Sequence, residues 1–144
     1  MVVLKMEEKK SKFKDNFITI VIIIFSLYCI VGVLSSKNSG ELFYIMGYKP
    51  VVVLSGSMEP YMETNSIVIV EKTKDVGIND AIFFMQDGKV PIIHRVVRFD
   101  ENGNIVTKGD ANDTEDFIPV TMNSVEGKVV LVLNWVSPIV DLFL

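Results

Sequence analysis

Cysteine and histidine are almost absent from this chain of 144 residues, since Cys29 and His94 are the single residues of their types. One cysteine excludes an intramolecular disulfide, and one cysteine with one histidine excludes a zinc site built from several such ligands. Cys29 lies in an apolar run, where it is expected to pack as a small hydrophobic residue. The cysteine content therefore does not indicate a redox compartment.

Positive charge is also scarce beyond the start of the chain. No cluster of Lys and Arg follows residue 14, and the net charge is -4. Nucleic-acid-binding proteins usually carry a basic patch, so we predict no nucleic-acid partner. The hydrophobic fraction of 49% and the charged fraction of 22% exclude general disorder, and the length suits one compact domain.

A long uncharged run follows a short basic head. Residues 1–16 hold five lysines and three acidic residues, and residues 17–34 read FITIVIIIFSLYCIVGVL. As a helix, this run would rise about 27 Å, close to the thickness of a bilayer's hydrocarbon core. The positive-inside rule would then place the N-terminus in the cytoplasm. We predict a cytoplasmic head at 1–16, a transmembrane anchor at 17–36, a β-rich domain outside the cytoplasm at 37–133 and an apolar tail at 134–144.

A cleavable signal peptide is the alternative interpretation of the same run, since it also has a basic start and an apolar middle. The run is at the upper limit of length for that class, and no Ala-x-Ala site follows it. A retained anchor is therefore preferred, and both interpretations send the body of the chain across the membrane.

The body is predicted to be mainly β. Short runs rich in Val, Ile and Phe are separated by Gly, Asn or Asp, and no amphipathic pattern longer than two helical turns occurs among them. The predicted strands are 51–54, 66–71, 81–85, 91–99, 104–108 and 127–133. Asp87-Gly88 and the segment 100–103 are hairpin signals. Strands at this short spacing favour an antiparallel barrel or sandwich-like sheet.

The apolar tail from residue 129 onward resembles a second membrane span but contains Asn134, Pro138 and Asp141. A final strand followed by a segment at the membrane surface, with Trp135 at the interface, is preferred over a truncated second anchor.

Two segments carry residues with catalytic potential. Ser55-Gly56-Ser57 follows the first predicted strand, and a nucleophile at a strand end suits a cleft, although Ser and Gly before Pro are also ordinary turn residues. The hydrolase elbow G-x-S-x-G is absent. His94 shares one face of its strand with Ile92 and Val96, where it is either a hydrogen-bonded core residue or a general base.

The segment 108–116, KGDANDTED, is the densest acidic cluster. Asp110, Asn112 and Thr114 have the spacing of the first calcium ligands of an EF-hand, but Glu115 stands where that loop needs glycine. We therefore predict no metal and no cofactor. Residues 112–114 also form an N-glycosylation sequon, and as a plain turn the segment would simply be solvated.

The order of these segments resembles type I signal peptidases. The resemblance rests on SGSMEP at 55–60, NDAIFF at 79–84, IHRVV at 93–97 and TKGDAN at 107–112, all behind one N-terminal anchor. It is closest to the branch of the endoplasmic reticulum, archaea and some Gram-positive bacteria, in which histidine replaces the bacterial lysine base. The resemblance covers roughly residues 17–133 and implies a signal-peptidase-like antiparallel β domain.

The resemblance also implies residue roles. Ser57 would be the nucleophile and His94 its general base. Asp116 falls where the family places the acid that orients the histidine, and Asp110 is also implied to be required. Ser55 would supply a hydroxyl to the oxyanion hole beside the Ser57 backbone N–H. The sequence leaves open which of the two aspartates contacts the imidazole.

The implied function is a membrane-bound serine endopeptidase of the plasma membrane or endoplasmic reticulum. It would remove signal peptides from preproteins, cleaving after small residues at the first and third positions before the bond, alone or with accessory membrane subunits. Two alternatives remain. One is a Ser-Lys protease with a base such as Lys108. The other is a non-catalytic anchored β-domain that binds peptides, or calcium at 110–116.

Overall fold

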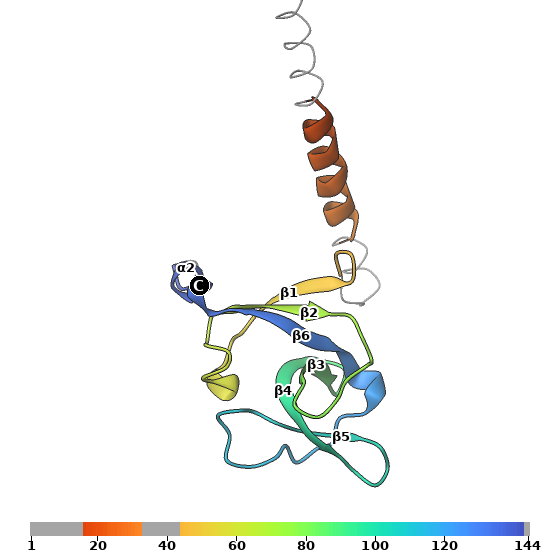
Figure 1. Cartoon of the computed structure of the whole chain (residues 1–144), viewed down its shortest axis with the longest axis vertical. Coiled ribbons are helices and arrows are strands. Elements are labelled where there is room, and N and C mark those ends of the chain that lie inside the picture. Colours follow the sequence, from red (N-terminus) through yellow and green to blue (C-terminus); the bar gives the residue numbers. More distant parts are fainter. Residues whose placement is uncertain (1–15, 33–43, 143–144) are drawn as a thin grey trace, which may run out of the picture. The chain divides into compact units, whose positions relative to one another are not determined.

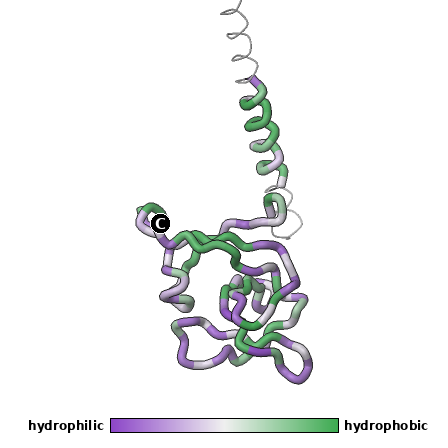
Figure 2. The backbone as a smooth tube through the Cα atoms, viewed as in Figure 1, coloured by the Kyte–Doolittle hydropathy of each residue, from purple (hydrophilic) through white to green (hydrophobic). Residues whose placement is uncertain are grey.

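The computed structural model describes residues 16–32 and 44–142 and divides the chain into two units, Met1–Ile45 and Met46–Leu144. In the first unit, residues 16–32 form a helix (Figure 1). Its side chains are mostly apolar and exposed (Figure 2). None of the helices in the described ranges combines the length and apolar character that crossing a membrane requires. The predicted basic head and the last four residues of the predicted anchor, 33–36, lie outside the described ranges, except for residue 16.

The second unit is one antiparallel sheet with little helix, so the mainly β prediction is confirmed. Its strand order is β1-β2-β6-β3-β4-β5. The strands are β1 (Tyr48–Val52), β2 (Ile67–Glu71), β3 (Ala81–Gln86), β4 (Val90–Phe99), β5 (Ile105–Lys108) and β6 (Val125–Leu133). Single turns of 3-10 helix lie at η1 (Gly56–Met58), η2 (Met122–Ser124) and η3 (Asn134–Val136), and α2 (Ser137–Val140) follows.

The first strand differs most from its prediction. β1 ends at Val52, whereas the sequence predicted a strand over 51–54. Among the described strands, β1 lies at the edge of the sheet and pairs with β2 alone, and an edge strand tolerates a proline such as Pro50, which lacks an N–H. Val53 still donates to the Ser66 carbonyl oxygen over 2.9 Å, so the chain remains attached to the sheet as it approaches Ser55.

Both predicted hairpin turns are present. Asp87 and Gly88 have φ values of 51° and 66° between β3 and β4, and Gly103 has a φ of 80° between β4 and β5. The Lys89 N–H donates to the Gln86 carbonyl oxygen over 3.0 Å, so Asp87 and Gly88 are the central residues of that turn. Residues 87–89 separate the paired residues Gln86 and Val90, and positive φ at Asp87 and Gly88 suits the right-handed twist of the flanking strands.

Three irregularities in strand register bend the sheet. They occur in the β2–β6, β3–β6 and β4–β5 pairs, and β-bulges increase local twist and curvature. Figure 1 shows β4 and β5 turned away from β1, β2 and β6. Inside the curve, six buried residues form one apolar cluster: Ile82, Phe84, Val96, Ile105, Val120 and Val125. The curvature brings the end of β1 opposite β4, although three strands separate them in the sheet.

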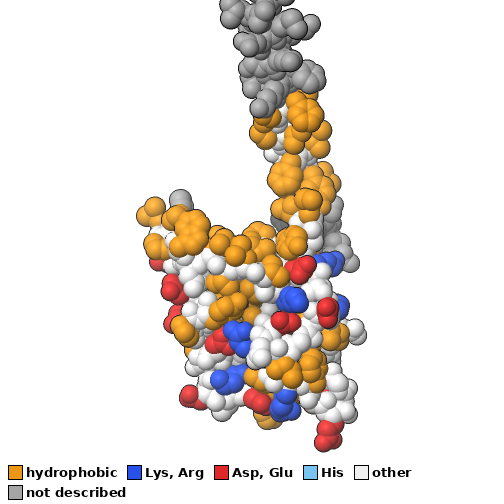
Figure 3. Space-filling model, viewed as in Figure 1, with side chains coloured by type: hydrophobic (Ala, Val, Ile, Leu, Met, Phe, Trp, Pro, Cys, Tyr) orange, Lys and Arg blue, Asp and Glu red, His pale blue; other side chains and the backbone are white. Residues whose placement is uncertain are grey.

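The C-terminal tail is tied to the loop at 61–65 by polar side chains. Asn134 accepts from the Glu63 N–H over 3.2 Å and donates to the Tyr61 carbonyl oxygen over 3.3 Å, and Asn65 donates to Asp141. Two polar residues that argued against a second span thus bond to the β unit. Trp135 and other apolar side chains of the tail are exposed (Figure 3).

Candidate active site

Ser57 lies in η1, just beyond the first edge strand. Met58 and Met62, with exposed fractions of 1% and 0%, anchor this turn in the core, and the Met62 N–H donates to the Met58 carbonyl oxygen. The Ser57 hydroxyl is therefore carried by a firmly packed turn.

His94 bonds to residues on both sides of its ring. Its Nε2 lies 3.2 Å from Ser57 Oγ, and its Nδ1 lies 2.6 Å from Oδ2 of Asp116. An ionised carboxylate only accepts hydrogen bonds, so Nδ1 carries the proton in this arrangement and Nε2 can accept from the Ser57 hydroxyl. The His94 side chain is 12% exposed, so the pair is largely shielded from solvent.

Asp116 is held by a residue that the sequence did not single out. The Thr107 hydroxyl donates to Asp116 Oδ2 over 2.6 Å, and the Asp116 N–H donates to the Thr107 carbonyl oxygen over 2.8 Å. Thr107 is fully buried on β5 and pairs with Val96 of β4. Threonine is common in strands, so its residue type did not mark Thr107 as a site residue. Its position directly before the Lys-Gly-Asp segment was the one sequence feature that could have drawn attention to it.

Asp110 binds Arg95 instead of the imidazole. Its two carboxylate oxygens accept from Arg95 Nε over 2.8 Å and from an Arg95 terminal nitrogen over 2.5 Å. The hydrogen bond to Asp110 is the main cause that raises the pKa of Arg95. Arg95 also donates to the Asn79 carbonyl oxygen over 2.7 Å and lies over the Tyr61 ring. Asp110 and Asp116 thus have separate partners.

The turn at 109–112 packs against the backbone of Ser57. The Ala111 N–H donates to the Ser57 carbonyl oxygen over 2.9 Å. A Cβ at Gly109 would lie 2.6 Å from the same oxygen and 2.7 Å from Nδ2 of Asn112, which is closer than real Cβ contacts come. Only glycine fits at residue 109 without displacing this turn or η1.

Ser55 lies beside Ser57 at the mouth of the site. The two hydroxyl oxygens are 3.3 Å apart, and Ser55 is exposed in extended backbone with a φ of -141°. A cavity of about 370 Å³ opens next to both serines. Its walls come mainly from residues 51–54 at the end of β1 and 91–94 on β4, and most of them are apolar.

Lys108 lies on the other face of β5. Successive strand residues point to opposite faces, and Lys108 pairs with Arg95 whereas Thr107 pairs with Val96. Thr107 and Val96 share the face of His94. Across the described ranges, the Lys108 side chain forms no hydrogen bond or ion pair, and Ser57 bonds to the imidazole instead.

Three of the four carboxylates of the acidic segment have partners within the protein. Asp110 and Glu115 pair with arginines, and Asp116 bonds to His94 and Thr107. Among the residues that the structure describes, no group of three or more His, Cys, Asp or Glu side chains could hold a metal ion. Asp110, the first residue of the EF-hand-like spacing, is paired with Arg95.

The chain is similar to known peptidases. It is 33% identical over 123 residues to "Signal peptidase I W" of Bacillus subtilis, an alignment that covers 81% of this chain and 65% of that protein. It is 39% and 46% identical to "Signal peptidase complex catalytic subunit SEC11" of Yarrowia lipolytica and Eremothecium gossypii, over 46% of this chain and 41% and 43% of those proteins. The chain thus spans less than two thirds of the length of each of these relatives. No family model matches it.

Proposed function

We propose that this chain, which is similar to signal peptidases, is a serine endopeptidase that removes signal peptides from preproteins. The observation that carries the proposal is the continuous hydrogen-bonded series from Ser57 through His94 to Asp116. A serine hydroxyl is a weak nucleophile until a neighbouring base accepts its proton, and this series supplies such a base with its orienting acid.

In the proposed reaction, Ser57 Oγ attacks the carbonyl carbon of the scissile bond while His94 Nε2 takes the hydroxyl proton. The imidazolium then gives that proton to the leaving amine, and the carbon–nitrogen bond breaks to leave an acyl-serine. A water molecule, deprotonated by the same nitrogen, releases the acid product and restores Ser57. Asp116 keeps the proton on Nδ1 and stabilises the imidazolium.

Three further residues would support this machinery. Ser55, with the Ser57 backbone N–H, would stabilise the negative charge on the carbonyl oxygen in the tetrahedral intermediate. Thr107 would act as a positioning residue, because it fixes the carboxylate that orients His94. Asp110 would act indirectly, since its pair with Arg95 holds the turn that packs against Ser57.

The substrate would bind as an extended chain in the cavity beside Ser57, with small residues at the first and third positions before the bond. A backbone-paired peptide obtains affinity from its main chain and selectivity from shallow pockets, so many sequences can be accepted. The apolar walls at 51–54 and 91–94 support this binding mode. The relatives named as catalytic subunits of a complex favour accessory subunits for this chain too.

We further propose that residues 17–36 anchor the chain in the plasma membrane or endoplasmic reticulum membrane, with the N-terminus in the cytoplasm. Residues 37–133 would form the catalytic domain on the other side, and the tail 134–144 would touch the membrane surface. The support comes from the exposed apolar side chains of the helix at 16–32 and of the tail, including Trp135 and Ile139. Tethering both enzyme and substrate to one bilayer raises their effective concentration.

The test is cleavage of a membrane-inserted preprotein by the purified chain in detergent, with the new N-terminus mapped by mass spectrometry. Wild type and Lys108→Ala should cleave after a small residue, and Ser57→Ala and His94→Ala should not. If His94→Ala cleaves the preprotein and Lys108→Ala does not, Lys108 is the general base instead of His94. If wild type and Ser57→Ala behave alike in every assay, with accessory membrane proteins added, the chain is a binding domain.

A further inference from the structure

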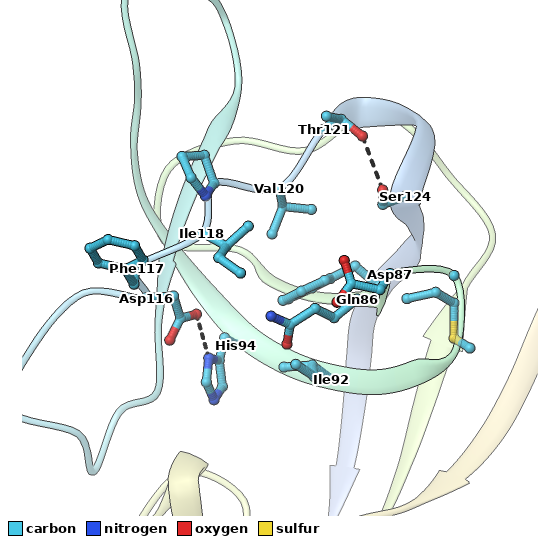
Figure 4. Close-up of a pocket in the computed structure, with 14 residues that line it drawn as sticks. Gln86, Asp87, Ile92, His94, Asp116, Phe117, Ile118, Val120, Thr121 and Ser124 are labelled. Atoms are coloured by element: carbon cyan, nitrogen blue, oxygen red, sulfur yellow. Dashed lines mark hydrogen bonds and ion pairs between the residues drawn. The ribbon is translucent and has the colours of Figure 1, made fainter.

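A second cavity, of about 520 Å³, shares the lining residues Ile92 and His94 with the first. Figure 4 shows the side chains that line this second cavity. His94 lines both cavities, whereas Ser57 and Ser55 line only the smaller one and Asp116 lines only the larger one. The larger cavity lies between the β3–β4 hairpin and the segment 116–121. The larger cavity therefore borders the general base of the proposed reaction but not the nucleophile.

The walls of this cavity are apolar with an acidic rim. Phe84, Ile92 and Val120 line it from the core side, and Ile118 points into it (Figure 4). Phe117, which is 98% exposed, stands at its edge. Among the residues that line the cavity, Asp87 and Asp116 are acidic and none is Lys or Arg. Such a surface favours an apolar or basic side chain and repels an acidic one.

The direction of the proposed reaction indicates what occupies this cavity. The acyl half of the substrate is bonded to Ser57, and the leaving amine takes its proton from His94 Nε2. The chain after the scissile bond therefore begins at the imidazole and runs away from the cavity that holds the acyl half. Of the two cavities, the larger one is lined by His94 but not by Ser57, as expected for a surface that binds the leaving half.

We propose that the larger cavity binds the first residues after the scissile bond, and that it selects apolar side chains and rejects acidic ones at those positions. This inference rests on the proposed function, because it assigns the leaving half of the same substrate. Specificity would then depend on both sides of the bond. Ile118 would contact the second or third residue of the released chain. Asp87 would repel an acidic side chain at those positions.

The first test compares kcat/KM for preproteins that are identical before the bond and carry Leu-Leu, Ser-Ser or Asp-Asp at the second and third positions after it. Wild type should cleave the Leu-Leu substrate about 10-fold faster than the Asp-Asp substrate, a ratio typical of one partly buried contact. Ile118→Ser should slow the Leu-Leu substrate alone, and Asp87→Asn should speed the Asp-Asp substrate alone. Ile78→Ser is the control, because Ile78 is similarly exposed and lies outside the cavity. Equal ratios in all four proteins would overturn the inference and leave the proposed function standing.

The second test does not depend on cleavage. Full-length Ser57→Ala is irradiated with a substrate that carries a photoreactive leucine analogue at the second position after the bond, and the crosslinks are mapped. Crosslinks within 84–92 or 117–121 are expected. Crosslinks confined to 51–58, or none at all, would overturn the assignment.

Discussion

Thr107 and His94 bind the same carboxylate oxygen, Oδ2 of Asp116, each over 2.6 Å. The Thr107 hydroxyl is buried in the sheet, and the Asp116 N–H returns a bond to the Thr107 carbonyl oxygen. Asp116 is thus fixed at its backbone and its side chain by one residue. Thr107 therefore holds the carboxylate to which the imidazole is bonded.

Thr107→Val should lower kcat about 10-fold with little change in KM, because it removes one hydrogen bond to a charged group while keeping the shape. Thr107→Ser should restore most of the rate, since it returns the hydroxyl. Steady-state cleavage kinetics of the three proteins, with melting temperatures as a check on folding, decide the point. If both variants lose activity equally, packing rather than the hydroxyl is responsible.

Gly109→Ala should reduce cleavage strongly, by about 10-fold or more, because the added Cβ would collide with the Ser57 carbonyl oxygen and Asn112. The matched control is Gly77→Ala, where the nearest atom outside the chain neighbours, an Asp80 oxygen, would be 3.9 Å away. Initial rates and thermal unfolding of both variants are the measurement. Equal activity in the two would show that the turn can move away without affecting Ser57.

Asp110→Asn should lower the free energy of unfolding by about 1–3 kcal/mol, because it weakens a two-pronged, partly buried pair with Arg95. Glu115→Gln is the control, because it removes the same charge from an exposed pair with Arg98. It should change the free energy of unfolding little. Urea unfolding at pH 7 compares the two. A larger effect of Glu115→Gln would contradict the structural role of Asp110.

Ser55→Ala should slow cleavage by about 10² to 10³ without abolishing it, as loss of one oxyanion donor does. Its hydroxyl lies 3.3 Å from Ser57 Oγ, close enough to reach the carbonyl oxygen of a bound substrate. Single-turnover rates would separate this effect from weaker binding. If Ser55→Ala is as fast as wild type, the Ser55 hydroxyl is not an oxyanion donor, and the Ser57 backbone N–H remains the proposed donor on this turn.

Acid should weaken the β4–β5 hairpin through Asp100. Hydrogen bonds from the Asn104 side chain, then from the backbone N–H groups of Asn104 and Asn102, lower the pKa of Asp100 from 3.8. Its stabilisation is therefore complete above that value and is lost as the pH falls through the lower pKa of the folded state.

Urea midpoints between pH 7 and pH 2 measure this effect. Asp100→Asn should lose less stability than wild type on acidification, and Asp113→Asn, an exposed carboxylate of the same charge, should follow wild type. Identical curves for Asp100→Asn and wild type would contradict the contribution of Asp100.

Sequence patterns located most strands and both hairpin turns, because alternating apolar residues and turn residues act over a few neighbours. They were less accurate at β1, which contains Pro50, because a proline is accepted in a strand mainly at a sheet edge and the order of the strands is not visible in a local pattern. They gave Thr107 no role of its own, because a threonine in a strand has no local feature that marks a bond to a distant carboxylate.

The sequence by itself determined that the chain has a β-rich body and that Ser57, His94 and the acidic segment are the residues with catalytic potential. Only the tertiary structure decided which of the acidic residues meets His94. Asp116 is 22 residues from His94 and Ser57 is 37 residues from it, so their meeting depends on strand register, bulges and the path of a loop. Asp110, only six residues before Asp116, binds Arg95 on the opposite face of β4, because neighbouring strand residues point to opposite sides of the sheet.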